Sequence, residues 1–253
     1  MTAKLYVGDN VEVLRRVVPD NSIQLTVTSP PYDNLRKYNG FTWDFEAVAR
    51  ELYRVATPGG VVVWIVADAT VNGSETGTSF RQALYFKECG FNLHDTMVWS
   101  KPNPNPRQCG PRYKQAYEYM FVLAKGGCSV FNPITEPCKL AGKKCSGTQR
   151  ENHVEGELVK QDRVYGETKT PGNVWTIAPQ GIGSHVACFP EKLAVDHIFS
   201  WSNPGDTVLD PFVGSGTTGK MAVLNSRDFI GIDISPAYVD LSKGRIPGAE
   251  VIL

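Results

Sequence analysis

Apolar positions along the first third of the chain alternate between the periods typical of strands and of helices. Strands are predicted at Leu5–Val7 and Ile23–Thr28, and the fully apolar run Val61–Ala67 is typical of a strand buried on both faces of a parallel sheet. Between them, Val11–Val18 and Phe45–Ala56 gather their apolar residues on one face of a helix. This alternation predicts βα units and a mostly parallel sheet.

The same alternation continues past residue 56 and returns near the C-terminus. A turn at Thr57–Gly60 is expected to end the second helix, because proline and two glycines follow one another there. The further predicted elements are a helix at Ser79–Cys89, strands at Asp95–Trp99 and Tyr119–Ala124, a helix at Glu191–Trp201, a strand at Thr207–Leu209, a helix at Thr217–Leu224, a strand at Phe229–Ile232 and a helix after Pro236.

Between these two ordered parts the apolar period fades, and Gly, Pro, Lys, Thr and Asn dominate from residue 125 to about 183. A segment of this length is too long for a passive loop and indicates an insertion with a function of its own. We therefore predict an α/β, doubly wound, mostly parallel Rossmann-like domain in two halves, residues 1–125 and 181–253, with an irregular insertion at 126–180.

Composition excludes several classes of protein. The 253 residues are 42% hydrophobic and 21% charged, as in ordinary globular proteins, and the longest apolar run is too short to cross a bilayer. The first residues lead directly into a strand pattern without a secretory signal, so we expect a cytoplasmic protein with no membrane partner. The six cysteines form no CxxC pair, and a zinc site from Cys128, Cys138, Cys145 and His153 fits no usual spacing, so no metal is expected.

Charge is segregated although the net charge is zero. Residues 101–150 carry two acidic residues, Glu118 and Glu136, and nine basic ones: Lys101, Arg107, Arg112, Lys114, Lys125, Lys139, Lys143, Lys144 and Arg150. This excess of +7 is typical of a segment that contacts a polyanion, although a solvated basic face would have the same composition.

The stretch "VLDPFVGSGTTGKMAV", residues 208–223, predicts a strand, a Gly-rich turn and a helix. Such a turn brings backbone N–H groups close to a ligand, and Asp233 in "FIGIDIS" ends the next strand, where a carboxylate can bind ribose hydroxyls. An adenosine-containing cofactor is indicated. The turn lacks the nicotinamide fingerprint and its pyrophosphate cradle, which favours S-adenosylmethionine, a cofactor without phosphates.

A P-loop ATPase is the alternative from another class, because G-S-G-T-T-G-K at Gly214–Lys220 satisfies most of that motif. Met221 stands where the Mg²⁺-binding Ser or Thr would be, and the acid of Asp210 would repel a triphosphate. Both features count against nucleotide hydrolysis.

A second unusual stretch is "TSPPY", where a β-branched strand ends on Ser29 and two prolines, followed by Tyr32. The prolines fix the backbone, so the Ser29 hydroxyl and the Pro30 carbonyl form a rigid pair of acceptors. Taken alone, the stretch is typical of a turn that ends a strand, with Tyr32 in the core.

Together these motifs resemble the permuted β class of DNA amino-methyltransferases. The resemblance covers nearly the whole chain apart from residues 126–180 and includes "SHVACFPEKL" and "VWSKPNPNP". It implies the catalytic residues Ser29, Pro30, Pro31 and Tyr32. In that role the Ser29 hydroxyl and the Pro30 carbonyl would bind the hydrogens of an exocyclic amine and aim its lone pair at a methyl donor, and Tyr32 would stack on a base taken out of the duplex. It also implies the S-adenosylmethionine-binding residues Asp9, Phe189, Pro190, Asp210, Phe212, Gly214, Ser215, Gly216, Thr217, Thr218 and Asp233.

In that family, serine at the first motif position accompanies cytosine N4 methylation more often, and aspartate accompanies adenine N6 methylation. Ser29 therefore favours N4-cytosine, with N6-adenine as the alternative within the class. A third alternative is a DNA-binding module whose methylation site has decayed. The intact motifs count against it.

Double-stranded DNA is the expected macromolecular partner, and residues 126–180 are the expected target recognition region. The predicted DNA-binding residues are Arg36, Lys101, Arg107, Arg112, Lys114, Lys139, Lys143, Lys144, Arg150 and Arg163. A homodimer and a cognate restriction endonuclease are left open as further partners.

Overall fold

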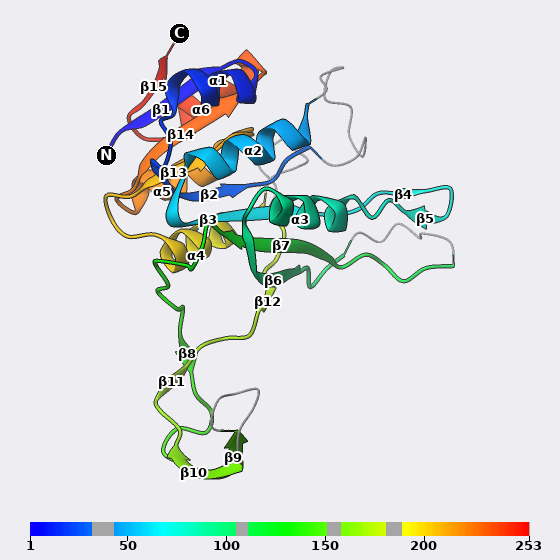
Figure 1. Ribbon diagram of the computed structural model, residues 1–253, viewed down its shortest axis with the longest axis vertical. Coiled ribbons are helices and arrows are strands. Elements are labelled where there is room, and N and C mark those ends of the chain that lie inside the picture. The colour runs from blue at the N-terminus through cyan, green and yellow to red at the C-terminus, as the bar shows by residue number, and fades with distance from the viewer. Residues whose placement is uncertain (32–42, 105–110, 151–157, 181–188, 253) are drawn as a thin grey trace. The chain divides into compact units, whose positions relative to one another are not determined.

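The computed structural model describes residues 1–31, 43–104, 111–150, 158–180 and 189–252, with side chains in these ranges except at 148–150 and 158–161. Two compact units divide the chain (Figure 1). The first unit comprises Met1–Asn132 and Asn173–Leu253, and the second comprises Pro133–Gly172. Each unit is described by itself below.

The described part of the first unit is built on a nine-stranded sheet of order β12-β6-β7-β3-β2-β13-β14-β1-β15. Neighbouring strands run parallel except around β7, which is antiparallel to both β3 and β6. This confirms the mostly parallel sheet. The strands are β1 Ala3–Val7, β2 Ile23–Thr28, β3 Ala56–Val66, β6 Asn92–Ser100, β7 Tyr117–Ala124, β12 Val174–Thr176, β13 Thr207–Asp210, β14 Asp228–Asp233 and β15 Ala249–Ile252.

Helices cover both faces of the sheet and enclose two hydrophobic cores. One core joins the sheet to α1, α2 and α3, and the other joins it to α4, α5 and α6. The sheet is therefore doubly wound, as the sequence predicted. The helices are α1 Asn10–Val17, α2 Phe45–Val55, α3 Thr78–Glu88, α4 Glu191–Trp201, α5 Thr217–Leu224 and α6 Pro236–Arg245.

The two ends of the chain interleave in the sheet. The N-terminal strand β1 lies between the C-terminal strands β14 and β15, with Ala3 opposite Phe229 on one side and Ala249 on the other (Figure 1). The carboxyl edge of this part of the sheet is consequently built from both ends of the chain.

Several elements have the predicted bounds because strong local signals flank them. Strand β2 stops before the prolines that follow Thr28, and α5 begins after Gly216. Asp44 caps α2, its carboxylate accepting a hydrogen bond of 3.1 Å from the Ala47 N–H.

Other elements differ from the prediction. The turn expected at Thr57–Gly60 is part of β3, where the register with β2 jumps from Ile23–Ala56 to Leu25–Val61 and forms a bulge. Gly59 absorbs the distortion with a φ of 80°. The short strands β12 and β15 and the small hairpin of β4 Thr70–Val71 and β5 Ser74–Glu75 were not predicted, because two to four residues are too few to show an apolar period.

The second unit is more regular than the predicted irregular insertion. Strand β9, Lys144–Arg150, pairs antiparallel with β10, Leu158–Val164, and β8, Glu136–Pro137, pairs with β11, Thr168–Lys169. The hairpin escaped prediction because the sequence of β9, KCSGTQR, is almost entirely polar. Residues 126–132 and 173–180 belong to the first unit.

Among the described helices, none is long and apolar enough to cross a membrane.

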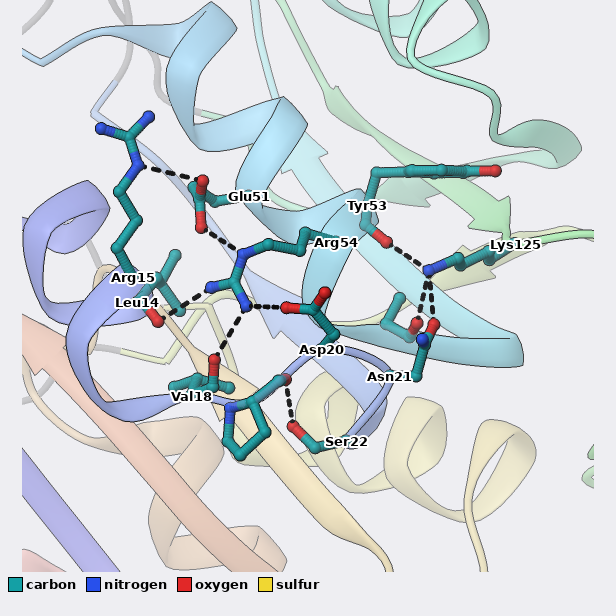
Figure 2. A network of polar contacts seen from close by, with 12 residues as sticks. Leu14, Arg15, Val18, Asp20, Asn21, Ser22, Glu51, Tyr53, Arg54 and Lys125 are labelled. Atoms are coloured by element: carbon teal, nitrogen blue, oxygen red, sulfur yellow. Dashed lines mark hydrogen bonds and ion pairs between the residues drawn. The ribbon is translucent and has the colours of Figure 1, made fainter.

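A polar network holds α1 and α2 together at the amino end of β2 (Figure 2). The Arg54 guanidinium donates to Glu51 at 2.8 Å, to Asp20 at 2.5 Å, and to the carbonyl oxygens of Leu14 at 2.9 Å and Val18 at 3.0 Å. The Glu51 side chain is only 9% exposed, and its charge is paired with Arg54 and, at 3.1 Å, with Arg15 of α1.

Arg54→Leu should lower the free energy of unfolding by about 2–4 kcal/mol, because the Leu14 and Val18 carbonyls would lose this donor and Glu51 would keep only its more exposed partner, Arg15. Arg50→Leu on the same helix is the matched control. Its pair with Glu46 is exposed on both sides, so the loss there should be within about 0.5 kcal/mol. Denaturant unfolding of the two variants measures the difference, and equal losses would contradict the structural role of Arg54.

Candidate active site

Four neighbouring parallel strands, β2, β13, β14 and β1, end at the same edge of the sheet. The chain leaves β2 through α2 toward β3, whereas it leaves β13 through α5 toward β14, in the opposite direction. Crevices at such a reversal are the usual ligand sites of open α/β sheets. The residues that directly follow these strands are therefore candidates for the site.

The proposed catalytic motif begins immediately after β2. Ser29 and Pro31 are half-buried and Pro30 is buried. Tyr32 and Arg36 lie outside the described residues.

The Gly-rich turn connects β13 to α5, and side chains of α6 bond its backbone. Gly216 caps α5 with a φ of 77°, and a Cβ there would lie 3.0 Å from the Cβ of Ser242, so both conformation and space call for glycine. The Ser242 hydroxyl donates to the Gly214 carbonyl at 3.0 Å, and the Arg245 guanidinium donates to the Ser215 carbonyl at 2.5 Å. The backbone of the turn is fixed by these contacts.

Asp233, at the end of β14, ties the turn to the neighbouring strands. One carboxylate oxygen accepts from the Gly214 N–H at 3.0 Å and the other from the Ser235 N–H at 2.9 Å. The Asp233 carbonyl also accepts from the Gly8 N–H at 3.0 Å, at the end of β1. The carboxylate predicted to bind ribose is thus oriented by backbone donors.

Asp9 follows Gly8 and caps α1. Its carboxylate accepts from the N–H groups of Val11 at 3.0 Å and Glu12 at 3.1 Å. Asp9, predicted as a cofactor-binding residue, therefore also has a structural role that the sequence did not reveal.

Phe189 and Pro190 are buried immediately before α4. Glu191, the first residue of α4, binds Lys220 of α5 at 2.7 Å and Arg245 of α6 at 3.2 Å, so the three helices meet there. In a P-loop, Lys220 would be the phosphate ligand. Its ion pair with Glu191 is a further feature against nucleotide hydrolysis.

Phe212, inside the turn, is half-buried and belongs to an aromatic cluster. Its ring lies 5.0 Å from that of Trp43 in an edge-on arrangement and 6.3 Å from that of Trp64. The cluster supports the turn from the α2 side of the sheet.

Four of the predicted cofactor residues have buried polar side chains. Asp210, Ser215, Thr217 and Thr218 are 2%, 7%, 4% and 0% exposed. The Asp210 carboxylate accepts from the Thr28 hydroxyl at 2.7 Å and from the Phe212 N–H at 3.1 Å. Burial raises the pKa of Asp210 to about 6, while its hydrogen bonds act in the opposite direction.

Two of the predicted DNA-binding residues of the first unit have partners within the protein. Lys101 pairs with Glu118 and lies 4.6 Å from the Trp99 ring, and Arg112 bonds the Gly73 carbonyl. Lys114 is exposed, whereas Arg107 lies outside the described residues.

The second unit carries the remaining basic candidates. Lys139, Lys143, Lys144 and Arg163 are exposed, and the Arg150 side chain lies outside the described ones. By sequence, residues 133–172 contain seven basic residues and six acidic ones, a net charge of +1. The excess of +7 positive charges counted over residues 101–150 is thus spread over both structural units and is not concentrated in the second one.

Thr28, Ser242 and Arg245 were missed by the sequence reasoning although each contacts the site. Ser242 and Arg245 lie on α6 outside the quoted motifs, and no local signal marks them. Thr28 had one signal, a polar residue at the end of a strand whose neighbours are apolar.

Comparisons with known proteins agree with this geometry. The family model N6_N4_Mtase, described as DNA methylase, matches residues 23–244. The orphan methyltransferase M.BamHII of Bacillus amyloliquefaciens is 47% identical over 92% of this chain and 92% of its own length. TTHA0409 of Thermus thermophilus, solved in complex with S-adenosyl-L-methionine, is 28% identical, with a TM-score of 0.68 over all of both chains. PvuII DNA methyltransferase (cytosine-N4-specific) shares the fold at 24% identity, with a TM-score of 0.72 over 97% of this chain and 86% of its own.

The fold and the site define an amino-methyltransferase of the Rossmann-like type. The chain belongs to the DNA methylase family, as the match over most of its length shows.

Asp210→Asn should change how stability depends on pH. A folded-state pKa of about 6, above the ordinary value of 3.8, means that the carboxyl favours the folded state below pH 4 and that this contribution is lost as pH rises through 6. The variant should therefore gain stability relative to the wild type between pH 4 and 7, by up to about 3 kcal/mol. Unfolding curves across this range test it, with Asp240→Asn, an exposed site on α6, as control. A difference that is flat with pH would refute it.

Proposed function

We propose that this chain transfers a methyl group from S-adenosylmethionine to the exocyclic N4 amine of cytosine in double-stranded DNA, with the base turned out of the duplex. The observation that carries the proposal is the placement of Ser29 and Pro30 at the end of β2, next to the strand β13 that leads into the Gly-rich turn.

The turn and Asp233 have the chemistry that the cofactor requires. Backbone N–H groups at the start of α5 and an oriented carboxylate suit a ligand with hydroxyl and carboxylate groups and no phosphates. We assign the ribose hydroxyls to Asp233, the adenine side to Asp9 and the methionine side to Phe189 and Pro190. When bound, S-adenosylmethionine supplies a methyl group on a positively charged sulfur.

The contribution of the protein is positioning. The Ser29 hydroxyl and the Pro30 carbonyl accept the two hydrogens of the amine, which releases its lone pair from the ring and aims it for in-line attack. As the new bond from nitrogen to the methyl carbon forms, the bond from that carbon to sulfur would break and leave a neutral thioether, and the amine would lose one proton to water. Two successive prolines keep the carbonyl direction fixed, so little reorganisation is required during the reaction.

The choice of cytosine rests on Ser29. A neutral hydroxyl is a sufficient acceptor for the cytosine amine, whereas an aspartate at this position is the stronger acceptor and accompanies adenine in the resembled class. Adenine N6 is therefore the alternative outcome of the test.

Recognition of DNA is assigned to the second unit together with Lys114 and Arg107. Lysine and arginine there would bind phosphates and fix the register of the duplex, and binding would weaken steeply with salt. The homodimer and the cognate endonuclease stay predictions; the relative M.BamHII is, by its name, an orphan.

Nucleoside mass spectrometry of DNA incubated with the protein and S-adenosylmethionine tests the proposal. The expected product is N4-methylcytosine at a defined sequence, absent when the methyl donor is omitted. N6-methyladenine alone would contradict the choice of base, and no methylated base at all would contradict the proposed activity.

Ser29→Ala should reduce methyl transfer about 100-fold or more, because one of the two amine acceptors is lost. The dissociation constant for S-adenosylmethionine should be nearly unchanged. Ser22→Ala at the opposite end of β2, where the hydroxyl bonds the Pro19 carbonyl at 2.7 Å, is the matched control and should retain activity. Single-turnover rates and calorimetric binding separate the two effects. Weaker cofactor binding with a normal rate would argue against the role of Ser29.

A further inference from the structure

The strand that carries Ser29 is only briefly paired with its neighbour β13. The ladder comprises Leu25–Val208 and Thr26–Leu209, whereas on its other side β2 stays paired with β3 as far as Thr28–Trp64. Continued in register, the ladder would bring Pro211, which has no N–H, opposite Thr28. Backbone bonding to β13 therefore ends before the catalytic motif begins.

Side chains replace the missing backbone bonds at this point. The Thr28 hydroxyl donates to Asp210 at 2.7 Å, and the Thr218 hydroxyl donates to the Val27 carbonyl at 3.1 Å. Thr28 and Thr218 are fully buried and Asp210 is nearly so. Hydrogen bonds in such a dry setting are strong and hold a defined geometry.

We propose that Thr28 is a positioning residue for methyl transfer: its bond to Asp210, supported by the bond from Thr218 to Val27, sets the place of Ser29 relative to the Gly-rich turn. Thr28 directly precedes Ser29, so rotation at Thr28 would move both amine acceptors. This inference rests on the proposed role of Ser29. In it, the Asp210 carboxylate holds Thr28 of β2 on the side of the turn that faces this strand.

The charge of Asp210 matters to this contact, because Thr28 and the Phe212 N–H donate to the same carboxylate oxygen. Burial raises the pKa of Asp210 to about 6, the bonds from Thr28, Phe212 and Thr218 lower it, and the charge of Asp233 raises it. The rate should therefore fall as pH drops through about 6. Loss of the Thr28 hydroxyl would raise this pKa further and move the acid limb to higher pH.

Thr28→Val, Thr28→Ser and Thr26→Val form the test set. Thr26 is buried on the same strand, and its hydroxyl has no described bond to Asp210, so it is the matched control. Single-turnover methyl transfer should fall about tenfold or more in Thr28→Val at pH 7, while the dissociation constant for S-adenosylmethionine stays within about threefold. Thr28→Ser should restore the rate, and Thr26→Val should have the wild-type pH profile.

The outcomes separate the positioning role from a packing role. An unchanged rate and acid limb in Thr28→Val, or an equal loss in Thr26→Val, would overturn the inference. If Thr28→Val does not fold, Thr218→Val removes the bond to the Val27 carbonyl and should slow single-turnover transfer at saturating S-adenosylmethionine in the same way. Normal transfer in that variant would overturn the inference. A wild-type protein that methylates no DNA would instead refute the proposed function.

Discussion

The contact between β2 and β13 joins the two halves of the proposed site. Two strands that lie far apart in the chain meet there, and the bond between Thr28 and Asp210 joins residues 182 positions apart. One strand leads into the proposed amine acceptors and the other into the Gly-rich turn. The proposed reaction requires both at one edge of the sheet, so in this proposal the short ladder and its buried side-chain bonds position the amine acceptors relative to the methyl donor.

The site carries local costs that the remainder of the fold offsets. A buried carboxylate at Asp210 disfavours the folded state at neutral pH, and the turn needs a left-handed Gly216. The two hydrophobic cores on either face of the sheet and the buried contacts of Arg54 with Glu51 supply stability away from the site. Such a division is expected where function requires a defined, strained arrangement and stability is only moderate in total.

Elements with strong local signals could be predicted from the sequence. Elements that form only by pairing with distant segments could not. Strand Ile23–Thr28 and helix Thr217–Leu224 were predicted with their observed bounds, because proline, glycine and apolar period coincide there. Strand Val174–Thr176 and the polar hairpin of β9 and β10 carry no such period, since pairing alone creates them. The motif residues of the site were identified locally, whereas the contact of Arg245 with the turn depends on a fold that brings distant helices together.

A crystal structure of the protein with bound S-adenosylmethionine would show whether the cofactor lies beside the proposed amine acceptors. We expect the cofactor at the carboxyl ends of β1, β2, β13 and β14, with its ribose at Asp233 and its methyl group directed toward Ser29, and with the bond between Thr28 and Asp210 intact. Cofactor bound at another edge of the sheet, or a methyl group directed away from Ser29, would contradict this expectation.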